Sequence, residues 1–211
     1  MRLLVWAAVA ATLMSQASHA DPARIAFPAD YPDKHLLYGI HNRPDNGQVR
    51  YLYANPIAAE GAKRAGPLPN GSVLVMVVYK AKVDAAGKPV EGADGTWERG
   101  DFVQYSLMEK QAGWGDAFPE NIRNGDWNYT IYTPDKVNKT DTKEEPCLIC
   151  HKALPDADFV LSYDELVVKV RGAVPSVVAG APAAAPGNPE RGKTLFTRCT
   201  NCHTADSSGK H

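Results

Sequence analysis

The sequence predicts an α+β fold, a mostly antiparallel β-sheet with a few helices, followed by a shorter, incomplete all-α segment at the C-terminal end. The sheet is indicated by several segments of β-branched and aromatic residues that turn residues separate. The division into two parts is indicated by an uncharged stretch over residues 174–189. With 44% hydrophobic and 22% charged residues in 211, the composition is that of an ordinary globular protein.

The strands are predicted from their apolar alternation or their Val content and from the turns that bound them. They cover residues 48–54, 72–83, 102–108 and 128–133. Asn55 and Pro56 fit the N-cap and first position of a helix that follows the first strand. Ser162 and Glu165 match a capping box, and the apolar residues after them predict a helix that closes a first domain over residues 21–173.

Residues 174–189 consist mostly of Ala, Pro, Gly and Val and are expected to form a semi-extended linker. A further helix is predicted over residues 190–199, because Asn188 and Pro189 can cap and begin it.

Residues 1–20 have the pattern of a secretory signal peptide. Arg2 supplies a positive charge, residues 3–14 are apolar, and Ser18-His19-Ala20 forms a small-x-small cleavage site. The apolar run is shorter than the roughly 20 residues of a membrane span, so we expect a periplasmic protein with no membrane span after cleavage. A net charge of −1 gives no electrostatic reason to expect nucleic acid as a partner.

All four cysteines lie in two C-x-x-C-H motifs, Cys147-Leu148-Ile149-Cys150-His151 and Cys199-Thr200-Asn201-Cys202-His203. This motif is typical of haem c attachment: the thiols bind the haem vinyl groups and the histidine binds iron. We therefore expect Cys147, Cys150, Cys199 and Cys202 to hold one haem per motif, with His151 and His203 as iron ligands. Zinc, structural disulfides and an exported thiol oxidoreductase are the alternatives for paired C-x-x-C motifs.

With these strands and the first motif in place, the chain resembles the cytochrome P-460 family, which shares its fold with the beta-type cytochromes c-prime. The similarity spans roughly residues 27–166 and depends on the order of several short pieces. They are Val49-Arg50-Tyr51 with Asn55-Pro56, Pro69-Asn70-Gly71-Ser72-Val73, Gly100-Asp101-Phe102, residues 127–135, and Asp158-Phe159-Val160 after the first motif. The resemblance implies a covalent haem with His151 as proximal ligand, an accessible distal side and a homodimer.

Residues 190–211 resemble the start of a class I cytochrome c domain, with Gly192 and Phe196 in their usual places. That fold requires tens more residues, including a distal Met. We therefore expect a truncated second domain, whose haem is lost if the truncation prevents its enclosure.

The resemblance also bears on the distal side of the first haem. Relatives that oxidise hydroxylamine carry a Lys cross-linked to the haem, and the ungapped alignment places Met76 there. Lys80 lies four residues on, about 13 Å along a strand, and Ser106 aligns with a carboxylate of those relatives. Arg50 matches an Arg of the distal pocket, although a surface position on an edge strand is the alternative.

Met76 is expected to be an apolar lid over the distal face, with iron ligation by Met76 or Met108 as the alternative. No catalytic residue is assigned. His35 and His41 are left without a role, and Trp97, Trp114 and Trp127 are expected to be packing residues.

The sequence therefore predicts a periplasmic c-type haem protein that acts in electron transfer and binds nitric oxide at an accessible distal site. Its partners would be a redox protein or a small diatomic or nitrogen ligand. The enzyme alternative is oxidation of hydroxylamine or a related nitrogen compound, with electrons passed to the second haem c.

Overall fold

The computed structural model describes residues 24–64 and 66–172. The predicted signal peptide, linker and second motif, with Cys199, Cys202 and His203, lie outside these described residues. The predictions for them therefore stay predictions.

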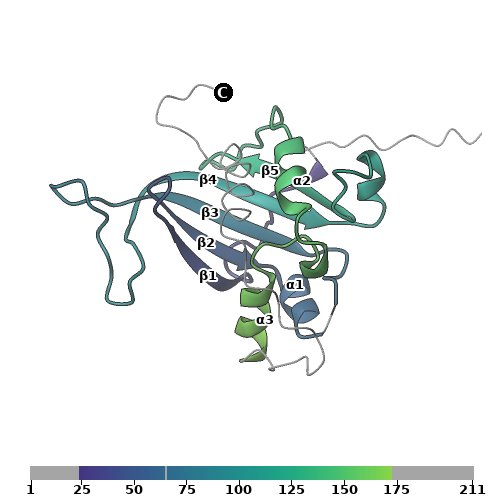
Figure 1. Cartoon of the computed structure of the whole chain (residues 1–211), viewed down its shortest axis with the longest axis horizontal. Helices are drawn as coiled ribbons and strands as arrows, with labels where there is room; N and C mark the ends of the chain where they lie inside the picture. Colours follow the sequence, from purple (N-terminus) through teal and green to yellow (C-terminus); the bar gives the residue numbers. More distant parts are fainter. Residues whose placement is uncertain (1–23, 65, 173–211) are drawn as a thin grey trace, which may run out of the picture.

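The described chain is built on one antiparallel sheet whose five strands follow one another in sequence order (Figure 1). They are β1 (Leu36–Arg43), β2 (Gln48–Ala54), β3 (Val73–Ala81), β4 (Arg99–Lys110) and β5 (Trp127–Tyr132). Four of them confirm the predicted strands with small changes at their ends. The α+β prediction is thus correct for this part of the chain.

Strand β1 was not predicted from the sequence. It pairs with β2 from Leu36 opposite Ala54 to Arg43 opposite Gln48, with a register shift between Leu37 and Gly39. As a result β2 is an inner strand, and the alternative that placed Arg50 on an edge strand is wrong.

Within residues 24–64 and 66–172, three α-helices accompany the sheet: α1 (Pro56–Ala62), α2 (Glu145–His151) and α3 (Tyr163–Arg171). The Asn55 cap of α1 is confirmed, because its side-chain oxygen accepts from the Ala58 amide at 2.9 Å. Helices α1 and α3 contact each other, and α3 also contacts β1 (Figure 1).

The predicted capping box at the start of α3 is wrong. Ser162 is the N-cap residue but makes no side-chain cap hydrogen bond. Its hydroxyl instead lies 2.8 Å from the Tyr38 hydroxyl, and the Glu165 carboxylate lies 2.6 Å from His41 Nε2. Both side chains therefore tie α3 to β1.

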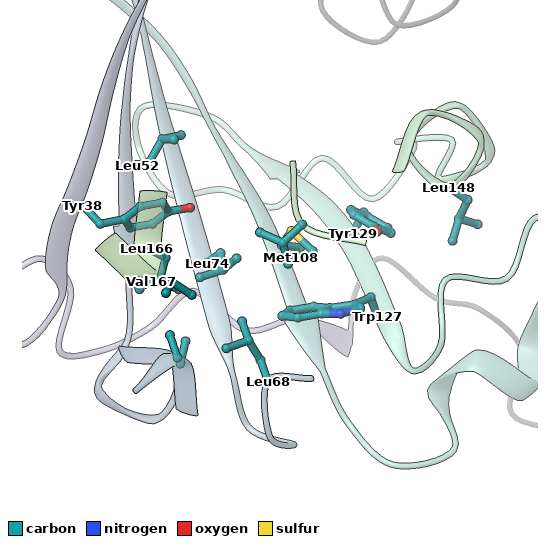
Figure 2. Packing of buried hydrophobic residues seen from close by; sticks show 14 of the residues in the cluster. Tyr38, Leu52, Leu68, Leu74, Met108, Trp127, Tyr129, Leu148, Leu166 and Val167 are labelled. Carbon is teal, nitrogen blue, oxygen red and sulfur yellow. The ribbon is translucent and has the colours of Figure 1, made fainter. Parts of the chain in front are cut away.

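The main core lies between the helices and one face of the sheet. Leu74, Met108, Trp127 and Leu148 belong to it, and Figure 2 shows Leu148 below its helix, on the side of the cluster where Tyr129 lies. Trp127 has no exposed surface, as expected of a packing residue. The opposite face of the sheet carries many aromatic rings, including those of Tyr51, Tyr53, Tyr79, Phe102 and Tyr105.

No helix among the described residues is long and apolar enough to cross a membrane.

Candidate functional site

A cavity of about 390 Å³ lies between the sheet and the first C-x-x-C-H motif. All five strands, α2 and the segment after it contribute to its walls, and most of the lining side chains are apolar. Its volume is within the range of about 300–1,000 Å³ that is typical of cofactor and ligand sites.

The sheet wall of the cavity is a row of side chains that β-pairing brings together. Leu52 on β2 is opposite Met76 on β3, and Met76 is opposite Ser106 on β4. All three line the cavity. The neighbouring row places Leu74 opposite Met108, which also lines the cavity. Met76 thus lines the same cavity as the motif, and its role as a lid stays a prediction.

The opposite wall is α2. Cys147, Cys150 and His151 all line the cavity, as expected for residues at i, i+3 and i+4 of a helix. The two intervening residues differ in their exposure to solvent. Leu148 is fully buried in the core, whereas Ile149 is 43% exposed. The core therefore fixes the rotation of α2 and directs the motif side chains into the cavity.

His151 is held in a defined tautomer. Its Nδ1 lies 2.6 Å from the Phe159 carbonyl oxygen, and because a carbonyl can only accept, Nδ1 carries the proton and donates. Burial lowers the pKa of His151 to about 4, so the ring is neutral near pH 7. The lone pair is then on Nε2, as a metal-ligating imidazole requires. Tyr129 packs against the ring, with centroids 4.8 Å apart.

The polar end of the cavity contains Arg50, which is only 4% exposed. Its Nη2 donates to the Gln48 amide oxygen at 3.0 Å. Burial, and then the neighbouring positive charge of Arg43, lower the pKa of Arg50 to about 10, which leaves it charged near pH 7. The Asp45 carboxylate opposes this lowering of the pKa. A buried guanidinium whose hydrogen-bond partner is a neutral amide can still attract an anion or a polarised ligand.

His41 also lines this end of the cavity, and its Nε2 lies 2.6 Å from Glu165 Oε2. Sequence reasoning left His41 without a role because β1 was not predicted. The structure places His41 opposite Arg50 in the β1–β2 pairing, and this position shows that His41 belongs to the site.

The other residues considered from the sequence lie away from the cavity. Lys80 is exposed and 3.8 Å from Asp101, so it does not take the place of a cross-linking Lys. His35 is buried near Asp30, and Trp97 packs against Val49 and Ala81.

The arrangement fits a covalently held haem. Two cysteines and a neutral histidine face an apolar cavity of suitable size, and no group of three His, Cys, Asp or Glu side chains in the described part could hold a bare metal ion.

The structure assigns Cys150 to a disulfide. A thioether at this sulfur requires the reduced thiol, so the two bonds exclude each other.

The family model described as Cytochrome P460 matches residues 28–162, which is more than half of the chain. The matched segment includes all five strands and the first C-x-x-C-H motif. No curated protein matches the chain.

Proposed function

Because the chain belongs to the cytochrome P460 family and is therefore a haem-binding protein, we propose that its cavity holds one c-type haem for electron transfer and for binding a small ligand such as nitric oxide. Cys147 and Cys150 would form the thioether bonds, and His151 would be the axial ligand. The observation that carries this proposal is the convergence of all three motif side chains on one cavity whose far wall is the sheet.

The protein's contribution on the proximal side is to hold His151. The hydrogen bond from Nδ1 to Phe159 fixes the ring plane and directs Nε2 away from the carbonyl. A bound haem would supply an iron that exchanges one electron and can bind a small ligand. Cys147 and Cys150, once bonded to the haem, would limit its movement relative to this ring.

On the distal side, Leu52 and Met76 present an apolar surface that limits access of water. Arg50 supplies hydrogen-bond donors at the polar end of the same space, where it can stabilise a ligand that gains negative charge. Met76 and Ser106, in place of a Lys and a carboxylate, favour ligand binding and electron transfer over hydroxylamine oxidation. Ser106 has a hydroxyl that accepts from Gln104 and is not a general base near neutral pH.

The second motif extends the proposal. Cys199 and Cys202 would attach another haem, with His203 as its ligand, and the linker over residues 174–189 would keep it near the first. A tether raises the effective concentration of the electron donor or acceptor, so transfer does not wait for a diffusive encounter. Export to the periplasm by residues 1–20 would place the chain where haem c proteins mature.

The test is to produce the full chain in a host competent for cytochrome c maturation and to measure its intact mass after denaturation. Wild-type protein is expected to retain covalent haem. A Cys147→Ala/Cys150→Ala variant should lose one haem, and a Cys199→Ala/Cys202→Ala variant reports separately on the second motif. Protein with titratable thiols or a disulfide and no covalent porphyrin would overturn the proposal in favour of a thiol oxidoreductase.

Optical spectra of the same protein distinguish ligand binding from turnover. A ferrous, high-spin haem whose bands shift on addition of nitric oxide supports the proposed distal site. A strongly red-shifted ferrous Soret band would indicate a cross-linked haem and would favour the hydroxylamine-oxidising alternative instead.

A further inference from the structure

We propose that Lys110 and Asp158 are positioning residues that set the hydrogen bond to His151 and thereby tune the haem iron. This inference rests on the proposed function, in which His151 is the iron ligand. Neither side chain lines the cavity, and both act through the backbone of Phe159.

The ion pair between these residues is buried and doubly bonded. Lys110 Nζ lies 2.8 and 2.9 Å from the two Asp158 carboxylate oxygens, and the side chains are only 11% and 7% exposed. Asp158 Oδ2 also accepts from the Leu68 amide at 2.9 Å. A charged pair with this burial and these additional hydrogen bonds holds a more defined geometry than an exposed pair.

The backbone that the pair anchors is unusual. Asp158 and Phe159 have φ angles of 48° and 60°, so two consecutive non-glycine residues are left-handed. Such residues persist only where the surroundings determine their conformation. The Phe159 amide donates to the Leu154 carbonyl at 2.8 Å, which closes the turn after α2. This conformation directs the Phe159 carbonyl toward His151 Nδ1, 2.6 Å away.

The ion pair of Lys110 and Asp158, here called the clamp, connects two parts of the fold. Lys110 is the last residue of β4 and pairs with Trp127 at the start of β5. The sheet, which forms the distal wall, therefore also fixes the carbonyl that orients the proximal histidine. A strong hydrogen bond to Nδ1 raises the basicity of the ligating nitrogen and stabilises ferric relative to ferrous iron. Loosening the clamp should weaken this bond and raise the reduction potential.

The Asp158→Asn variant tests the clamp with little change of shape. Asn tolerates the left-handed conformation and can still accept from the Leu68 amide, but it removes the negative charge. Lys110→Met removes the partner charge and keeps an apolar stem of similar length. Both are made in the full chain carrying Cys199→Ala/Cys202→Ala, so that only the first haem contributes to the signals.

The measurements are the reduction potential and the iron–histidine stretching band in the resonance Raman spectrum of the ferrous protein. Both variants are expected to shift the potential to more positive values and the band to lower frequency. The double variant should show no more than the larger single effect, because the two residues act as one unit. Lys110→Arg keeps the ion pair and should therefore leave the reduction potential and the Raman band at their wild-type values.

The matched control is the exposed ion pair of Lys82 and Glu98, whose side chains are 56% and 44% exposed. Lys82→Met and Glu98→Gln are expected to move neither signal. A purely structural clamp would lower the melting temperature of the Asp158→Asn and Lys110→Met variants while the potential and the Raman band stay unchanged, and this result overturns the inference alone. A wild-type protein without covalent haem at the first motif overturns the proposed function as well.

Discussion

Replacing Leu148 and Ile149 one at a time by Ala tests the orientation of α2, on which the whole site depends. Leu148 has no exposed surface and packs in the main core, and its carbonyl accepts from the buried Asn124 amide. Leu148→Ala should therefore cost about 2–5 kcal/mol of unfolding free energy, through lost burial and the cavity left behind. Ile149 is 43% exposed, so Ile149→Ala should cost about 0.5 kcal/mol or less.

The assay is urea unfolding of both variants with matched haem content, followed by far-ultraviolet circular dichroism. With a slope of about 1–3 kcal/mol per molar urea, a loss of about 3 kcal/mol moves the midpoint by about 1–3 M. Ile149→Ala should leave the midpoint close to that of the wild type. Equal losses, or a larger loss at Ile149, would mean that α2 is rotated and that Cys147 and His151 do not face the cavity.

Three further predictions concern single side chains. Arg50→Met should weaken nitric oxide binding to the ferrous protein about 10- to 150-fold, because a hydrogen bond to a charged group contributes about 1.5–3 kcal/mol; an unchanged dissociation constant would remove Arg50 from the ligand site. Met76→Ala should leave a high-spin spectrum unchanged, whereas a change from low-spin to high-spin would identify Met76 as an iron ligand. Burial lowers the pKa of His35, so the unfolded chain takes up the proton first, and stability should fall as the pH drops below about 6.5. His35→Phe keeps the edge contact with Tyr31 and should flatten this dependence in thermal unfolding at several pH values, whereas an unchanged slope would assign the pH dependence to another group.

The sheet was largely predictable because most of its strands carry the usual pattern of β-branched and aromatic residues. Strand β1 breaks that pattern for a functional reason. The β1 residues that line the cavity are Tyr38, His41 and Arg43, and the last two pair with Arg50 and Gln48 on β2. Polar side chains on a strand normally indicate the solvent face, but here they face the cavity. Because these polar side chains belong to the site, β1 lacks the hydrophobic alternation from which a strand is predicted.

The capping-box prediction for the start of α3 was wrong for a different reason. Ser162 and Glu165 have the local spacing of a capping box, but both side chains are used by residues 124 positions earlier in the chain, Tyr38 and His41. A local pattern cannot reveal such a competition, because it arises only when β1 is placed against α3. The tertiary contacts replaced the cap without preventing the helix.

The site residues also differ in how they can be predicted: some follow from local sequence spacing, and others depend on tertiary contacts. Cys147, Cys150 and His151 could be placed on one helix face from their spacing alone. Arg50 and Met76 could be identified only through the resemblance to a family, since nothing in their neighbours marks them. Lys110, which is 48 positions from Asp158, could not be found at all, because the need for this ion pair follows from the left-handed turn after α2.

The two walls of the cavity therefore determine different properties. In the proposed haem site, the motif helix would determine where the haem is attached and where its proximal ligand stands, and this depends on spacing and on the burial of Leu148. The sheet row of Leu52, Met76 and Ser106 would determine what can bind on the other face of that haem. In this chain the row has no amine and no carboxylate, which supports the proposed ligand binding and electron exchange over the proposed alternative of hydroxylamine oxidation.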